Sequence, residues 1–107
     1  MSYKKGDIVL VKFPFTNLVN YKKRPVLIIN DENSLGDIVC FQITSNFKQS
    51  NIIKIEKEYL TTTLKIDSYI KYDKCFTLSS DIVDKKISSI TQDFLEILKN
   101  EFCNLMF

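Results

Sequence analysis

The side chains that could carry out chemistry in this 107-residue sequence are those of arginine, lysine, the carboxylates and the hydroxyls, because the chain contains no histidine. The missing histidine excludes every Ser-His or Cys-His pair that could activate a nucleophile. Positive charge gathers in Lys22-Lys23-Arg24 and in a second cluster, Lys4-Lys5. The net charge is only +2, so charge alone favours a solvated surface over a nucleic-acid site for such clusters.

Several other classes of site are excluded by composition. Cys40, Cys75 and Cys103 are widely spaced and odd in number, which predicts reduced thiols and no disulfide framework. Without CxxC spacing and without histidine, a zinc site is not expected. Gly6 and Gly36 are the only glycines, so P-loop and dinucleotide-binding fingerprints are excluded. We therefore expect a protein that works without a metal or cofactor.

The elements that must position the candidate side chains are predicted to be short strands followed by one helix. Strands are expected at residues 7–13, 26–29, 38–43, 52–55 and 69–72, with a short sixth at 86–88. Pro14 should end the first strand, since proline cannot donate to a ladder, and residues 13–22 should form a loop. The continuous apolar run of residues 26–29 is typical of a fully buried strand.

The C-terminal segment changes to a helical period, which predicts a helix over residues 92–103 with Thr91 as its N-cap. Asp93 suits the positive first turn, and Ile90 can pack onto Leu95. Strands followed by one helix predict a single domain over residues 1–107, mainly β, with a strongly curved antiparallel sheet that forms a partly closed barrel. There is no signal-peptide segment and no apolar run of membrane-spanning length, so we expect a cytoplasmic protein without membrane contact.

Three segments together resemble the PemK/MazF family of toxin endoribonucleases. They are residues 6–16 (GDIVLVKFPFT), residues 22–29 (KKRPVLII) and residues 42–45 (QITS). The similarity continues through residues 67–73 into the C-terminal segment and so covers nearly the whole chain. It implies an SH3-like barrel that forms a homodimer. It also implies the toxin of a type II toxin-antitoxin system, which cleaves single-stranded RNA at short sequences without a metal and is bound by a cognate antitoxin.

The resemblance also implies a catalytic site. In the family, the arginine before the proline and the threonine-serine pair after the third strand face the scissile phosphate, and these positions are Arg24, Thr44 and Ser45 here. Some members use a basic residue and a carboxylate two positions apart on the fifth strand as acid and base, here Lys71 and Asp73. RNA carries its own nucleophile, the 2′-OH, so the expected products end in a 2′,3′-cyclic phosphate and a 5′-OH.

Further RNA contacts are expected from the basic triplet and from aromatic side chains that can stack on bases. With Ser45, the candidate RNA-binding residues are Lys22, Lys23, Phe15, Phe47 and Thr77. For Phe15, packing in the core or in a dimer is an equally good interpretation. The antitoxin would lay an extended or helical acidic segment over the basic groove.

Each part of this site has a plainer interpretation. Arg24 could only pair with a surface carboxylate, Thr44 could only end a strand, and Lys71 with Asp73 could be alternating charges on an exposed face. The sequence also departs from many family members, because Phe76 replaces an arginine and Ser79 an aspartate. A lysine at position 71 keeps the positive charge but cannot fork onto a phosphate.

Two alternatives to an endoribonuclease stay open at this point. The same fold occurs in toxins that poison DNA gyrase, so the chain could bind a protein target without catalysis. It could also be a single-stranded RNA-binding barrel with a degenerate site, which would bind RNA in a salt-sensitive way without cutting it.

Overall fold

The computed structural model describes residues 2–14 and 21–107, and of residues 13, 14, 21 and 22 it describes the backbone alone. The predicted contact of Phe15 lies outside the described residues, as does the side chain of Lys22. The described elements are the strands β1 (Asp7–Pro14), β2 (Tyr21–Ile28), β3 (Asp37–Thr44), β4 (Ile52–Lys54), β5 (Tyr69–Ser79) and β6 (Val83–Ser89), the short 3-10 helices η1 (Lys57–Tyr59) and η2 (Ser80–Ile82), and the helix α1 (Gln92–Met106).

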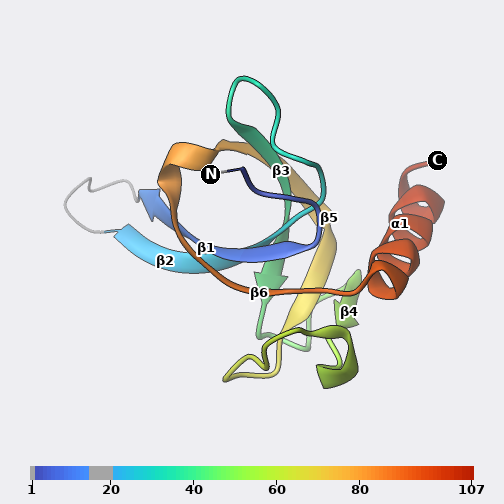
Figure 1. Ribbon diagram of the computed structural model, residues 1–107. Helices are drawn as coiled ribbons and strands as arrows, with labels where there is room; N and C mark the ends of the chain where they lie inside the picture. The colour runs from blue at the N-terminus through green and yellow to red at the C-terminus, as the bar shows by residue number, and fades with distance from the viewer. Residues whose placement is uncertain (1, 15–20) are drawn as a thin grey trace.

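The strands form one antiparallel sheet in the order β4-β5-β3-β2-β1-β6. Figure 1 shows the sheet curling strongly on itself, with α1 lying against its outer side. The two edge strands, β4 and β6, are not paired with each other in this order, so the barrel is partly closed. The prediction of a mainly β fold with a C-terminal helix is confirmed. Among the described residues, no helix is long and apolar enough to span a membrane.

Hydrophobic side chains pack on both faces of the sheet, and successive residues along a strand point to opposite faces. Val26 and Ile28 point to the inner side of the curve, whereas Leu27 between them points toward α1. All three are at most 1% exposed, which confirms the prediction of a buried strand for residues 26–28, whereas Ile29 is half-buried and lies after the end of β2. The inner cluster consists of Val9, Val11, Val26, Ile28, Ile38 and Cys40. The cluster on the side of α1 consists of Ile8, Leu27, Phe41, Ile43, Ile55, Ile70, Ile90, Phe94 and Leu98.

The predicted bounds of three strands, β2, β5 and β6, were wrong. β2 begins at Tyr21, not at residue 26, and pairs with β1 through Lys12–Lys23 and Pro14–Tyr21. The segment predicted as a loop over residues 13–22 therefore contains the end of one strand and the start of the next. The basic triplet carries no apolar signal, and its strand conformation comes from pairing across the hairpin. Pro14 does end β1, as predicted.

β5 is the second wrong boundary, because it continues to Ser79 and not to residue 72. Its pairing with β3 shifts at one point: Lys71 faces Gln42, and the next paired position joins Cys75 to Phe41. The intervening residues of β5 form a bulge, which bends the strand and increases its twist. β6 is likewise longer than predicted and begins at Val83.

The helix begins where it was predicted and ends slightly later. The Thr91 hydroxyl accepts a hydrogen bond from the Phe94 amide at 3.3 Å, which satisfies one of the open amides of the first turn. Ile90 and Leu95 pack in the same cluster on the side of α1, as expected for residues that flank a helix start.

The Gly6-Asp7 pair at the start of β1 is explained by structure alone. Gly6 adopts a positive φ of 96°, which L residues rarely adopt. Asp7 accepts a hydrogen bond from the Lys4 amide at 3.0 Å and forms an ion pair with Lys86 at 3.1 Å. The pair shapes the turn that leads into the first strand.

Candidate active site

Pro25 marks the point where β2 and β3 separate. The two strands pair through Ile28–Cys40, Leu27–Phe41 and Val26–Gln42, and their pairing ends there. Proline has no amide hydrogen, so it cannot extend a ladder in the direction in which its nitrogen would point. β1 and β2 remain paired past this position, so the gap opens between β2 and β3 only.

A cleft of about 300 Å³ lies at this separation. Two residues beyond the Val26–Gln42 pair stand Arg24 on β2 and Thr44 on β3. Side chains alternate along a strand, so both lie on the same side of the sheet as that pair. The residues that line the cleft are Lys23, Arg24, Pro25, Gln42, Ile43, Thr44, Ser45, Ile66 and Ser68. The structure thus brings Arg24, Thr44 and Ser45 to one cleft.

The Thr44 hydroxyl is held from two sides. Its oxygen accepts a hydrogen bond from the Asn46 amide at 3.1 Å and a second from Gln49 Nε2 at 3.3 Å. A hydroxyl has two acceptor lone pairs and one donor hydrogen, so both acceptor positions are in use. The hydroxyl hydrogen is therefore directed away from both partners and can be donated to a group in the cleft.

Lys23, which lines the cleft, is paired with a carboxylate that the sequence did not indicate. Asp84 on β6 lies 3.2 Å from Lys23 Nζ and 3.9 Å from Lys12 Nζ. Lys12 and Lys23 face each other across β1 and β2. Asp84 offsets part of the positive charge that these two lysines would otherwise present to a polyanion.

Lys71 and Asp73 form a second cluster on β5. Lys71 Nζ lies 2.9 Å from Asp73 Oδ1 and donates a hydrogen bond to the Ser50 carbonyl at 3.0 Å. Asn51 Nδ2 donates to Asp73 Oδ2 at 3.3 Å. Lys71 is only 8% exposed, so the interpretation of alternating charges on an exposed face is wrong for this pair.

The Lys71 ammonium holds the pKa of the Asp73 carboxyl below its ordinary value of 3.8, against the opposing effect of burial, and the Asn51 amide adds to the lowering. Asp73 Oδ1 is enclosed and has no hydrogen bond of good geometry within the described residues, so its contact with Lys71 is an ion pair. Asp73 is consequently a carboxylate at neutral pH.

The two clusters share one face of the sheet without sharing the cleft. Lys71 faces Gln42 and Tyr69 faces Thr44 across β3 and β5, so Lys71 and Thr44 are diagonal neighbours on the same side. Diagonal neighbours in a sheet lie about 7–8 Å apart, within reach of a long side chain. Neither Lys71 nor Asp73 lines the cleft.

Other predicted contacts are not brought to the cleft. Phe47 is 66% exposed in the segment that follows β3. Thr77 pairs with Val39, and the five residues from Val39 to Thr44 along β3 correspond to roughly 17 Å. The two departures from the family pattern have structural roles: Phe76 packs against the inner cluster, and the Ser79 hydroxyl accepts from the Asp81 amide at the start of η2.

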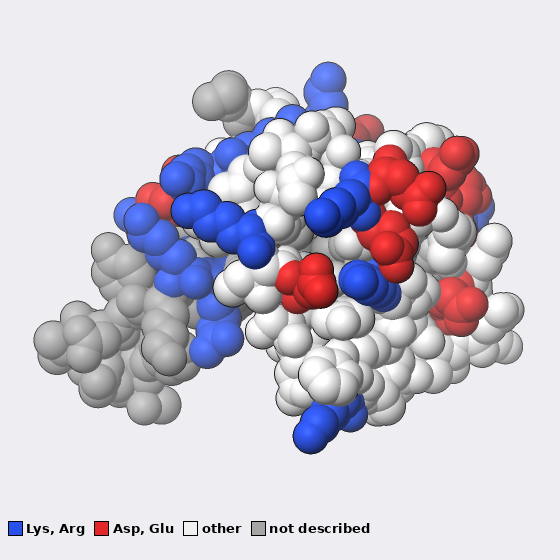
Figure 2. Space-filling model, turned by 90° about the horizontal axis from the view of Figure 1, so that it is seen from below, with Lys and Arg blue, Asp and Glu red and all other residues white. Residues whose placement is uncertain are grey.

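Figure 2 shows how charge is distributed on the face that contains β6 and the loops after β4. Blue side chains gather on the side next to the β1–β2 hairpin, and red ones are more frequent on the opposite side. The described residues contain no group of three or more histidine, cysteine or carboxylate side chains that could hold a metal ion.

Burial raises the pKa of the Cys40 thiol to about 12, so this cysteine is a packing residue.

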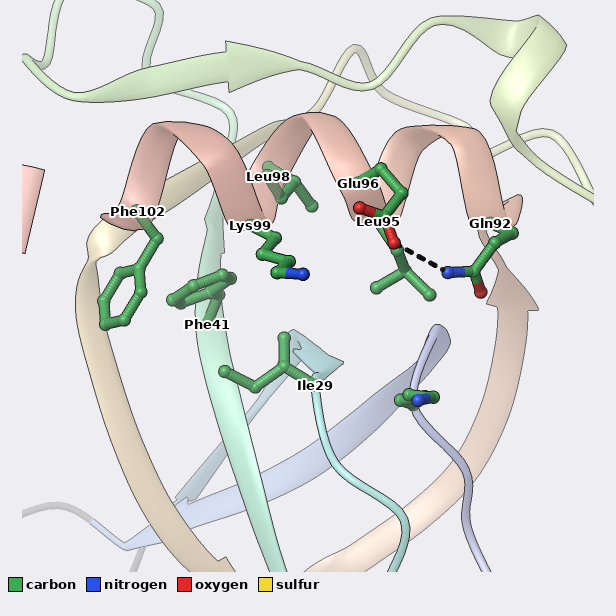
Figure 3. A pocket seen from close by; sticks show the side chains of 9 residues that line it. Ile29, Phe41, Gln92, Leu95, Glu96, Leu98, Lys99 and Phe102 are labelled. Carbon is green, nitrogen blue, oxygen red and sulfur yellow. Dashed lines mark hydrogen bonds between the residues drawn. The ribbon is translucent and has the colours of Figure 1, made fainter. Parts of the chain in front are cut away.

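A separate cavity of about 370 Å³ lies between α1 and the sheet. Figure 3 shows side chains of α1 facing Ile29 and Phe41 across it, and the dashed contact joins Gln92 to Glu96 at 3.2 Å. The ring of Phe102 lies against Phe41, with centroids 5.3 Å apart. The residues that line this cavity are those that pack the helix α1 on the sheet.

Comparison with known proteins agrees with this geometry. A family model described as "PemK-like, MazF-like toxin of type II toxin-antitoxin system" matches residues 4–106. A chain of the MazE-MazF crystal structure (Form-II) from Deinococcus radiodurans is 15% identical, with a TM-score of 0.81 over 97% of this chain and 95% of that one. An endoribonuclease in complex with its cognate antitoxin from a mycobacterial species is 15% identical, with a TM-score of 0.71 over 95% and 90% of the two chains.

A third similar structure, the Mycobacterium tuberculosis toxin MazF-mt6, is 17% identical, with a TM-score of 0.65 over 90% of this chain and 93% of that chain. At these identities the structures show a shared fold. Among curated protein sequences, none matches this chain.

Proposed function

The chain belongs to the family of PemK-like, MazF-like toxins of type II toxin-antitoxin systems, and we propose that it is an endoribonuclease that cleaves single-stranded RNA without a metal ion. One observation carries the proposal. Arg24 and Thr44 face a cleft beside the end of the β2–β3 ladder, and the Thr44 hydroxyl has its hydrogen left to donate. A phosphate diester that enters the cleft meets a guanidinium on one wall and this hydroxyl on the other.

In this proposal the cleft stabilises the negative charge that develops on phosphorus. The 2′-oxygen of the RNA attacks the adjacent phosphorus, and the bond from phosphorus to the 5′-oxygen breaks. The Arg24 guanidinium contacts two phosphoryl oxygens at once and remains charged at every relevant pH. The Thr44 hydroxyl donates to one of the same oxygens, and fixed donors of this kind stabilise a transition state without further reorganisation.

Asp73 and Lys71 supply the two proton transfers. The Asp73 carboxylate takes the proton of the 2′-OH, and the Lys71 ammonium gives a proton to the departing 5′-oxygen. The products are a 2′,3′-cyclic phosphate and a 5′-OH. Because Lys71 Nζ and Asp73 Oδ1 are in contact at 2.9 Å, one proton transfer from the carboxyl group to the amine restores both groups.

A cognate antitoxin and a second copy of the chain complete the proposal. Similar structures contain MazF with MazE and an endoribonuclease with its cognate antitoxin, so we expect an acidic segment of a partner to occupy the basic side of this chain. A homodimer is consistent with the exposed apolar side chains at the end of α1, Leu105, Met106 and Phe107. In this proposal the protein acts in the cytoplasm, where it meets both mRNA and the antitoxin.

The test is to incubate the purified protein with a long single-stranded RNA in EDTA and to map the ends of the fragments. Site-specific cuts with 5′-OH ends are expected, and a 2′-deoxynucleotide placed before the cut should abolish that cut. RNA that is bound but left intact would favour the degenerate RNA-binding barrel. RNA that is neither bound nor cut would favour a relative that binds a protein target.

A further inference from the structure

Three consecutive residues, Gln49 to Asn51, connect the two clusters of the candidate site. We propose that this segment is a positioning clamp, which fixes the donor direction of Thr44 and the relative placement of Lys71 and Asp73 for RNA cleavage. The inference rests on the proposed endoribonuclease function and deepens it, since neither the family pattern nor the cleft assigns a role to this segment.

Each residue of the clamp contacts a different member of the site. Gln49 Nε2 donates to Thr44 Oγ1 at 3.3 Å. The carbonyl of Ser50 accepts from Lys71 Nζ at 3.0 Å. Asn51 Nδ2 donates to Asp73 Oδ2 at 3.3 Å. A segment of three residues therefore holds the hydroxyl, the ammonium and the carboxylate at once.

The clamp is itself fixed by its backbone. Asn51 has a φ of 56°, the one positive φ found outside glycine in the described residues. Asparagine is among the residues that tolerate this left-handed conformation. The Asn51 carbonyl accepts from the Tyr72 amide at 3.2 Å, which ties the clamp to the bulged part of β5. At the other end, Asn46 accepts from the Gln49 amide at 3.5 Å and, through its side chain, from the Lys48 amide at 3.0 Å.

Gln49 determines which way the Thr44 hydroxyl points. The amide nitrogen of Gln49 can only donate, so Thr44 Oγ1 must accept from it and keep its own hydrogen for another acceptor. A glutamate at position 49 would reverse this bond, because an ionised carboxylate can only accept. The Thr44 hydrogen would then be directed at the glutamate and withdrawn from the cleft.

Ser50 and Asn51 orient the two groups of the proton-transfer pair, Lys71 and Asp73. The ammonium of Lys71 has three donor hydrogens, of which one is directed to the Ser50 carbonyl and one lies toward Asp73, so one remains for a substrate oxygen. The Asn51 amide donates to Asp73 Oδ2 and so orients this oxygen without adding a charge. Removing the amide would leave Asp73 held by Lys71 alone, with Oδ2 no longer oriented.

The variants follow from these contacts. Gln49→Ala removes the hydrogen bond that is donated to Thr44, whereas Gln49→Glu reverses the direction of this bond. Asn51→Gly removes the amide and keeps the left-handed backbone, which Asn51→Ala would strain. Gln92→Ala is the matched control, because Gln92 lies on α1 and its side-chain amide contacts Glu96.

The experiment measures kcat and KM for cleavage of one short RNA by each variant, together with the pH profile of kcat and a thermal unfolding curve. We expect kcat to fall about tenfold in Gln49→Ala and further in Gln49→Glu, with KM within about twofold of the wild type, since Arg24 and the lysines still bind the phosphates. In Asn51→Gly the acid limb of the profile should move to higher pH, because Asp73 loses a hydrogen bond that favours its ionised form.

Two failures are distinguishable in this design. Wild-type cleavage together with unchanged kcat and pH profile in folded Gln49→Glu and Asn51→Gly would overturn the clamp and leave the proposed function intact. A wild-type protein that does not cut RNA would overturn the proposed function, and the catalytic role of the clamp with it. A kcat loss in Gln92→Ala equal to that in Gln49→Glu would also overturn the clamp, because the effect would then be a general loss of structure.

Discussion

Lys71 Nζ lies 2.9 Å from Asp73 Oδ1, and the two residues belong to the stretch of β5 where the pairing with β3 shifts. In a regular strand, side chains two positions apart stand side by side on one face. Here both residues lie in the bulged stretch, and Lys71 is only 8% exposed. The ion pair is therefore enclosed at the point where the strand bends.

Replacing Lys71 by methionine should raise the pKa of Asp73, because the ammonium is the largest of the effects that lower it. In the wild type the lowered pKa contributes stability above the ordinary carboxyl value of 3.8, and this is lost as the pH falls through the folded-state value. In Lys71→Met, acid unfolding should begin at higher pH. Titration of the Asp73 carboxyl carbon by NMR measures the shift, and Lys74→Met, at an exposed position of β5, should leave it unchanged.

Pro25→Ala should narrow the cleft. An alanine supplies the amide hydrogen that proline lacks, so the β2–β3 ladder can extend toward Arg24 and Thr44. We expect slower hydrogen exchange at the amide of residue 25 and of Ile43, and RNA cleavage about tenfold slower than in the wild type. An amide at residue 25 that exchanges as fast as an exposed one, with unchanged cleavage, would show that proline does not hold the strands apart.

Replacement by alanine should lower the free energy of unfolding far more at Phe94 than at Phe47. Phe94 is 1% exposed and stacks on Tyr59 with ring centroids 4.8 Å apart, so Phe94→Ala should lower the free energy of unfolding by about 3–5 kcal/mol. Phe47 is 66% exposed, and Phe47→Ala should change it by less than about 0.5 kcal/mol.

Phe47→Ala also tests the prediction that this ring stacks on a base, since loss of one stacked base costs about 1–3 kcal/mol of binding. A gel-shift titration with single-stranded RNA should therefore show weaker binding by Phe47→Ala. An unchanged Kd would remove Phe47 from the RNA-binding surface.

Asp84→Asn should strengthen RNA binding. Asp84 lies 3.2 Å from Lys23 Nζ and 3.9 Å from Lys12 Nζ, so its removal releases positive charge beside the cleft. The Kd for a short single-stranded RNA should fall several-fold at low salt, and log K should depend more steeply on log salt, by about 0.7 for each additional phosphate contact. Asp93→Asn on α1 makes the same charge change away from the cleft. An equal effect of both variants would mean that net charge alone is responsible.

The fold could be predicted from the sequence where one pattern dominates. The apolar run that contains Val26 and Ile28 is buried on both faces, and the helical spacing of Phe94, Leu98 and Phe102 marks the helix that covers the sheet. The start of β2 could not be predicted, because its first residues are held by pairing with β1 and not by their own burial. The bulge in β5 depends on the register with β3, which no local pattern records.

The candidate site could be predicted in part for the same reasons. Arg24 and Thr44 lie close together because β2 and β3, which are separate segments of the chain, pair in one register. Before the structure, only the resemblance to a family predicted that these two residues share a site. Gln49 and Asn51 left no signal in the sequence. Gln49 lies five residues from Thr44, and Asn51 lies 22 residues from Asp73, so their roles depend on how the segment after β3 folds back.

The central claim is that Arg24 and Thr44 act on the scissile phosphate. Its most direct test is the single-turnover rate of RNA cleavage in Arg24→Ala and Thr44→Val, with Lys99→Ala on α1 and Thr77→Val far along β5 as matched controls. We expect a loss of about 10²–10³-fold for Thr44→Val, as for removal of one fixed donor to a developing oxyanion, and at least as large a loss for Arg24→Ala. Cleavage by both variants at rates close to those of folded control variants would contradict the account.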